Sequence, residues 1–232
     1  MVDAKYTTAA RRAFVVRRVH ALSGILPLGV FLVVHLGILA TALRGEGAFR
    51  AAVGKLQAIP LLGAVEVAGI FVPLAFHSVT GLWLFGWGAR GERPRSPRNQ
   101  TELAARDPLK VAQRWSGILA LVFIGAHLWE YRVQTWLYGM RSEAFHDALA
   151  AHLSSTVSGA PVVALAYLAG LAATVFHFAS GLATFCSSSG ITASPSARRR
   201  AGYAFAALGV GLFLVGADTI VFFATGSRAA FR

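Results

Sequence analysis

The sequence predicts an all-α membrane protein of five transmembrane helices, in which two repeated hairpins form a four-helix bundle and the fifth helix lies outside it. Three observations support this fold class. Of the 232 residues, 56% are apolar and 14% charged, with a mean hydropathy of +0.58, which is too apolar for a soluble domain of this length. Five stretches are long enough to cross a hydrocarbon core of roughly 30 Å, and a block of residues recurs. The predicted spans are 21–43, 58–88, 115–137, 161–187 and 201–225.

We expect the first span to be retained. Residues 40–42, Ala-Thr-Ala, resemble a signal-peptidase site after a basic N-terminus. However, an apolar stretch of about twenty residues exceeds the hydrophobic segment of a signal peptide, and four further spans follow. The sequence therefore predicts one integral membrane domain over residues 1–232.

Basic residues between the spans predict the orientation in the membrane. The net charge is +12, but these residues lie in the loops and not on one solvated face, so we expect membrane lipid, and no nucleic acid, as a partner. Fifteen of the 22 Lys and Arg residues precede span one or follow spans two and four. Because cytoplasmic loops are rich in Lys and Arg, the N-terminus is predicted to be cytoplasmic and the C-terminus outside, in a bacterial inner membrane.

Spans two and four contain the same block of residues. Residues 76–85 and 176–185 both read F-H-x-x-[S/T]-G-L-x-x-F. Spans one and three share Ser-Gly-Ile-Leu at 23–26 and 116–119, each followed by a histidine. Spans one and two thus resemble spans three and four, which predicts two equivalent hairpins around a pseudo-twofold axis, with span five left over.

Four histidines, one in each of these spans, are the candidate metal ligands. At a helix rise of about 1.5 Å per residue, His35 and His127 lie roughly 8–13 Å from the outer charges, and His77 and His177 lie roughly 24–26 Å from the outer helix starts. The first two form an outer layer and the last two an inner layer. An imidazole in hydrocarbon needs a partner, and two stacked bis-histidine b haems would provide it and carry electrons.

Neighbouring residues fit the same ligand. Thr80 and Ser180 follow the inner histidines by three positions and Gly81 and Gly181 by four, so they share a helix face with the imidazole. Glycine there lets a flat macrocycle approach the backbone, although small residues also pack helices together. Zinc would need three or four converging ligands, and the single Cys186 provides neither a disulfide nor a CxxC motif.

Other polar residues are candidates for the haem propionates and for a quinone. At the cytoplasmic ends of spans one and three, four residues could hold propionates or contact lipid headgroups: His20, Ser23, Arg114 and Ser116. Three carboxylates are expected towards the outer side, where they could serve quinone protonation or only a structural hydrogen bond: Glu66, Glu130 and Asp218. His146 and His152, in the outer loop, are expected to be solvated.

Three stretches are distinctive: RRVHALSGILPLGVFLVVH (17–35), QRWSGILALVFIGAHLWE (113–130) and VFHFASGLATFCSSSGITASP (175–195). They resemble the dihaem cytochrome b membrane anchor, of the b558 type, of succinate dehydrogenase and fumarate reductase. The resemblance covers nearly the whole chain in order. It implies that His35, His77, His127 and His177 bind haem and that His20 lies near the inner propionates.

The family implies a complex in which a cytoplasmic flavoprotein oxidises succinate, an iron–sulfur subunit relays the electrons, and this subunit passes them through the inner and outer haems to a quinone, usually menaquinone. The subunit itself would have no flavin or dicarboxylate site, and a higher oligomer of the complex is compatible with this interpretation. Some members carry a glutamate proton route two residues before the last ligand, where this chain has Val175. Three alternatives stay open: a fumarate reductase anchor, a haem wire for another membrane reductase, and a transporter or proton channel.

Overall fold

The computed structural model describes residues 4–84, 108–139 and 144–227, which form helices joined by turns. Five helical runs are long and apolar enough to cross a membrane: Arg11–Arg44, Leu62–Trp83, Pro108–Tyr138, Val162–Ser188 and Pro195–Thr225. They match the five predicted spans, so the protein is an all-α membrane protein.

The first three runs contain π-helical turns. The first run consists of α1 (Ala4–Ser23), the π-helical η1 (Gly24–Leu28), α2 (Gly29–Ala40) and the 3₁₀ turn η2 (Thr41–Arg44). The second consists of α4 (Leu62–Glu66), the π-helical η3 (Val67–Phe71) and α5 (Val72–Trp83), and the third of α8 (Pro108–His127), the π-helical η5 (Leu128–Val133) and α9 (Gln134–Tyr138). Pro27 and Pro73 lack the N–H that would bond four residues back, which accounts for the widened turns η1 and η3.

The last two runs are single helices, α11 (Val162–Ser188) and α12 (Pro195–Thr225). Two shorter helices, α3 (Glu46–Gln57) and α10 (Phe145–Leu153), lie between runs. The sequence defines both ends of α12. Ser194 accepts a hydrogen bond from the N–H of Ala197 at 3.1 Å, Pro195 is the first helical residue, and Gly226 follows the last with a left-handed φ of 72°.

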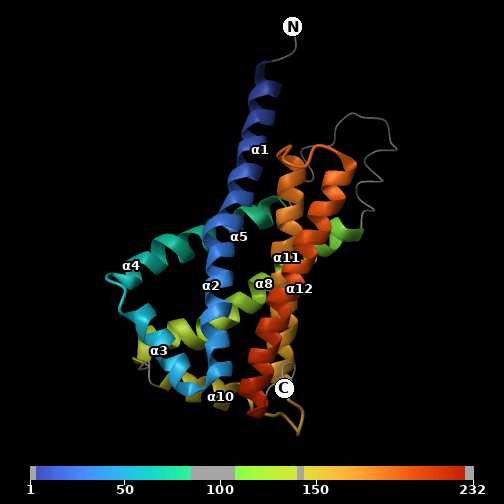
Figure 1. Ribbon diagram of the computed structural model, residues 1–232. Helices are drawn as coiled ribbons and strands as arrows, with labels where there is room; N and C mark the ends of the chain where they lie inside the picture. The colour runs from blue at the N-terminus through green and yellow to red at the C-terminus, as the bar shows by residue number, and fades with distance from the viewer. Residues whose placement is uncertain (1–3, 85–107, 140–143, 228–232) are drawn as a thin grey trace. The chain divides into compact units, whose positions relative to one another are not determined.

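The chain divides into two compact units. Unit 1 comprises Met1–Phe31 and Gly63–Val111, and unit 2 comprises Leu32–Leu62 and Ala112–Arg232. In unit 1, α1 packs against α5, and η1 contacts both α5 and η3. In unit 2, α11 and α12 run side by side, as the orange and red helices of Figure 1 show. The predicted four-helix bundle draws on both units and stays a prediction.

Small residues let α11 and α12 approach each other in unit 2. A Cβ on Gly209 would lie 3.0 Å from the Cβ of Ala179, and one on Gly216 would lie 2.7 Å from Leu171. Leu171 is buried in one core cluster with Leu36 of α2 and Val175 of α11. Close helix contact through small residues is the usual way in which membrane helices associate.

A second core cluster lies where the short helices meet the end of α12. Phe49 of α3 is 2% exposed and packs with Leu149 and Leu153 of α10 and with Phe223 of α12. The ring of Phe49 also lies edge-on to the ring of His146, with 5.9 Å between centroids. This cluster holds α10 against the rest of unit 2.

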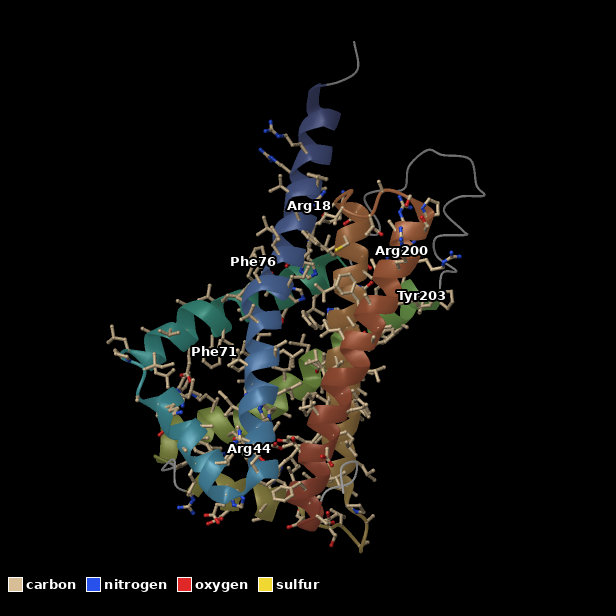
Figure 2. All side chains as sticks on the ribbon, viewed as in Figure 1. Arg18, Arg44, Phe71, Phe76, Arg200 and Tyr203 are labelled. Carbon is tan, nitrogen blue, oxygen red and sulfur yellow. The ribbon has the colours of Figure 1, made fainter. Side chains whose placement is uncertain are left out.

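Two arginines mark the ends of unit 2. Arg44 ends η2 at one end of the unit, and Arg200 lies at the other, near the start of α12 (Figure 2). The count of basic residues assigns these two arginines to opposite sides of the membrane, and that orientation stays a prediction. Between them, large apolar side chains such as Val122 and Val210 are more than half exposed, as expected for surfaces that face lipid.

Candidate functional site

His77 of α5 is held by residues of the first helical run in unit 1. Its Nδ1 lies 2.9 Å from the main-chain oxygen of His20 and 3.3 Å from Ser23 Oγ. Ser23 donates its hydroxyl to the same oxygen at 2.8 Å. The ring lies on Gly24, where an added Cβ would fall 2.5 Å from the imidazole Cε1. Because a carbonyl only accepts, Nδ1 carries the proton in the neutral ring, and Nε2 has the lone pair that a metal would use.

His177 of α11 has the same surroundings in unit 2. Its Nδ1 lies 2.9 Å from the main-chain oxygen of Gln113, and a Cβ on Gly117 would fall 2.7 Å from its Cε1. Ser116, which is 7% exposed, donates to that oxygen at 3.0 Å. The repeated segments therefore build the same histidine environment twice, each from a Ser-Gly pair and the carbonyl three residues before the serine.

The hydroxyls of the repeated block bond within their own helices, and that of Thr80 also lies 2.9 Å from Nδ1 of His20. Thr80 donates to the main-chain oxygen of Phe76 at 2.6 Å, and Ser180 donates to that of Phe176 at 2.7 Å. These bonds to the carbonyl four residues back are typical of small hydroxyl residues in helices.

The two glycines of the block differ in their contacts. A Cβ on Gly81 would lie 3.1 Å from Cε1 of His20, whereas one on Gly181 would lie 3.8 Å from Nε2 of Gln113, an ordinary contact. Only Gly81 is therefore required by close packing with a neighbour, and Gly181 leaves room at its surface.

Of the four predicted propionate residues, three contact or support the inner histidines. His20 stacks on His77 with 4.1 Å between ring centroids and 14° between planes. Ser23 and Ser116 donate to the carbonyls that receive the imidazole protons. Arg114 is exposed on α8. Their contact with propionates stays a prediction.

The outer histidines meet within unit 2. The rings of His35, on α2, and His127, at the end of α8, have centroids 5.8 Å apart and planes at 73°. This contact brings the two rings of the predicted outer layer together, and their binding of one metal stays a prediction. His77 and His177 belong to different units, so their pairing stays a prediction.

A polar cluster adjoins His127. Tyr167 of α11 donates its hydroxyl to Oε2 of Glu130, and the Tyr167 oxygen lies 3.5 Å from Nδ1 of His127. His152 of α10 places its Nε2 3.4 Å from the same Glu130 oxygen. A cavity of about 350 Å³ opens here, lined by Trp129, Glu130, Tyr131, Gln134, Ala148 and His152. Its volume lies within the range of small-molecule sites.

The other two predicted carboxylates lie elsewhere in the chain. Glu66 precedes η3 in unit 1. Asp218 of α12 is 2% exposed in unit 2 and is not among the residues that line the cavity. Of the three, Glu130 alone lines a described cavity beside a histidine candidate.

A further group of possible metal ligands lies on the surface of unit 2. Glu46, His146 and Asp147 bring their ligand atoms within 4.8 Å of one another. The Glu46 carboxylate already pairs with Arg50 at 2.5 Å, and a guanidinium at that distance opposes cation binding. This group is therefore a weaker candidate for a metal site than the four histidines of the spans.

Sequence reasoning missed Gln113, Tyr167 and His152. A signal existed for Gln113, because it precedes Ser116 by three residues as His20 precedes Ser23. The predicted solvation of His146 and His152 is only partial, since their side chains are 17% and 35% exposed. Both are partly covered because α10 packs onto α3, α11 and α12.

The chain is similar over nearly its whole length to a characterised protein. The succinate dehydrogenase cytochrome b558 subunit of Bacillus subtilis (strain 168) is 34% identical over 215 residues, which are 93% of this chain and 99% of that protein. No protein-family profile matches the chain, and no solved structure matches it.

Proposed function

The chain belongs to the family of succinate dehydrogenase cytochrome b558 subunits, and from this premise we propose that it anchors a succinate dehydrogenase in the membrane and conducts its electrons to a quinone. The flavoprotein and iron–sulfur subunits lie on the cytoplasmic side, with the N-terminus of this chain. Those partners carry out the dicarboxylate reaction. Menaquinone is the proposed acceptor.

Two b haems are the cofactors in this proposal. His35 and His127 hold the outer haem, and His77 and His177 hold the inner one. The observation that carries the proposal is the repeated environment of His77 and His177, in which Nδ1–H donates to a main-chain oxygen and a glycine makes room for the ring. Metal-ligating histidines are usually oriented in this way. A bound b haem would supply one-electron transfer, and two histidine ligands would leave no open position for oxygen.

The quinone is proposed to react at the cavity beside Glu130. Tyr167 connects this carboxylate to His127 through the contacts described above. A quinone exchanges protons as well as electrons, and a carboxylate at the aqueous edge of the membrane can pass them on. His20 and Arg114 are the proposed propionate partners at the opposite, cytoplasmic ends of their spans.

Haem counting and redox titration of the purified complex test the proposal. We expect two low-spin haems per chain, and His77→Gln or His177→Gln should each remove only the inner one, while His146→Gln should keep both. One haem per wild-type chain would contradict the two pairs. A folded chain without haem would favour a transporter.

A quinone-site inhibitor tests the place of the quinone. It should shift the potential of the outer haem, and a shift confined to the inner haem would contradict the cavity beside Glu130. Co-purification of a flavoprotein distinguishes this anchor from a haem wire for another reductase. The same arrangement serves succinate oxidation and fumarate reduction.

A further inference from the structure

His152 forms a pair with the carboxylate at the cavity. Its Nε2 is buried and lies 3.4 Å from Oε2 of Glu130, while 35% of the side chain is exposed. The ring is held edge-on between the rings of Tyr131 and Tyr167, each with 5.9 Å between centroids. One ring nitrogen is thus buried beside the carboxylate, and the residue lines the cavity.

The position of each ring nitrogen determines what the imidazole can do. The Tyr167 hydroxyl donates to Oε2 of Glu130, and Nε2 of His152 is buried 3.4 Å from the same oxygen, within ion-pair distance but without a hydrogen bond. With Nε2 buried beside the carboxylate, Nδ1 is the nitrogen that can exchange a proton with a ligand. A carboxylate that orients an imidazole and stabilises its protonated form is the arrangement that proton-transfer catalysis uses elsewhere.

We propose that His152 is the residue that binds a quinone oxygen in this cavity and transfers protons between the quinone and the outer water, with Glu130 as its positioning residue. This inference rests on the proposed function. Reduction of one quinone to the quinol takes two electrons from the haem chain and two protons. For each proton, an N–H bond of His152 breaks, an O–H bond forms on the quinone, and water on the outer side reprotonates the imidazole. Quinol oxidation reverses these steps.

The surroundings of His152 support a role in proton transfer. The titratable groups in described contact with it are Glu130 and Tyr131 from η5 and Tyr167 from α11. The Glu130 carboxylate lies at ion-pair distance from Nε2. His152 has no described contact with the proposed haem ligands and reaches His127 only through Tyr131 and Tyr167, so its replacement should keep the haem.

The experiment compares His152→Gln with His146→Gln in the complete complex, in native membranes. His146 is the matched control, because it lies on the same helix, is partly buried and is not among the residues that line the cavity. Four quantities are measured in both variants: haem content, succinate-driven reduction of a soluble dye, the rate of reduction of a short-chain quinone across pH, and the affinity for a quinone-analogue inhibitor.

In His152→Gln, we expect quinone reduction to fall at least about tenfold, because positioned acid–base groups contribute roughly 10²–10⁴-fold. The dependence of the rate on pH should also change, because a group that exchanges protons with the quinone is removed. Inhibitor binding should weaken, since one hydrogen bond is lost, while haem content and dye reduction stay at the wild-type level. His146→Gln should match the wild type in all four.

A wild-type quinone rate, pH profile and inhibitor affinity in His152→Gln would overturn the inference. If His152→Gln loses haem, the variant Ala148→Leu provides the test instead. Ala148 lies one helical turn before His152 and also lines the cavity. The larger side chain should then block quinone reduction with haem retained, and an unchanged rate would contradict the inference. Failure of the proposed function is distinct, because it appears in the wild type as missing haem or no quinone reduction.

Discussion

Gly117 and His177 are packed so closely that a Cβ on the glycine would fall 2.7 Å from Cε1 of the imidazole. In the other half of the repeat, a Cβ on Gly24 would fall 2.5 Å from Cε1 of His77. Both glycines lie in helical segments, so their role is to admit the neighbouring ring and not to provide an unusual backbone angle.

We predict that Gly117→Ala removes the inner haem. The added methyl group would displace the imidazole of His177 and break its hydrogen bond to Gln113, so the ring would lose its orientation. The haem count, measured by pyridine haemochrome, should fall from two to about one per chain, since loss of a ligand's supporting contacts costs roughly 10- to 100-fold in metal affinity. Gly24→Ala should have the same effect through His77. Gly211→Ala, whose Cβ meets nothing within 4 Å, is the control, and two haems in Gly117→Ala would contradict the prediction.

Tyr167→Phe should raise the potential of the outer haem. The Tyr167 oxygen accepts from Nδ1–H of His127, which makes that imidazole a stronger electron donor and favours oxidised iron. Loss of a bond worth about 1 kcal/mol raises a one-electron potential by tens of millivolts. Redox titration measures the change, with Tyr203→Phe as the control because Tyr203 is exposed on α12 (Figure 2). An unchanged outer potential would show that this contact does not affect the iron.

Gly170→Ala should destabilise unit 2 near the outer haem. The new Cβ would lie 2.2 Å from the ring of Phe123. The centroid of that ring lies 5.9 Å from the ring centroid of His127 and 5.3 Å from that of Tyr167. Overpacking of this kind costs about 1–3 kcal/mol. Thermal unfolding should begin at a lower temperature, with earlier loss of the outer haem. Gly202→Ala has open space and should unfold like the wild type.

Phe49→Ala should lower the free energy of unfolding by about 3–5 kcal/mol, the usual cost of removing a buried phenylalanine. Its ring is 2% exposed between α3, α10 and α12, so its loss should also loosen α10 and slow quinone reduction. Circular dichroism of the detergent-solubilised protein measures stability. Phe14→Ala, at a side chain that is 52% exposed, should change it little, and equal effects of the two substitutions would refute the role of this core cluster.

Hydropathy predicted all five helical runs because the membrane leaves a long apolar segment no alternative to a helix. The repeated blocks also predicted that His77 and His177 have equivalent environments, since equal sequence at equal spacing places the same atoms on the same helix face. The contacts of Tyr167 and His152 with Glu130 could not be predicted in this way. They depend on how η5, α10 and α11 pack together, and no periodicity records that packing.

Two of the π-helical turns could be predicted from the sequence, and the third could not. Pro27 and Pro73 account for η1 and η3, so a reader of the sequence could expect them. Residues 128–133 contain no proline, yet they form η5, which begins directly after His127 and carries Glu130. Such turns occur often at functional sites, where local strain is tolerated for the position it gives a side chain.

The acceptors that orient His77 and His177 belong to the main chain, although the residues that provide them, His20 and Gln113, have unrelated side chains. Any amino acid that keeps the helix can supply the same oxygen. Substitutions at positions 20 and 113 therefore leave the orientation of the two histidines unchanged, whereas positions 24 and 117 accept no larger residue. The two halves of the repeat can diverge in sequence while both keep the same ligand geometry.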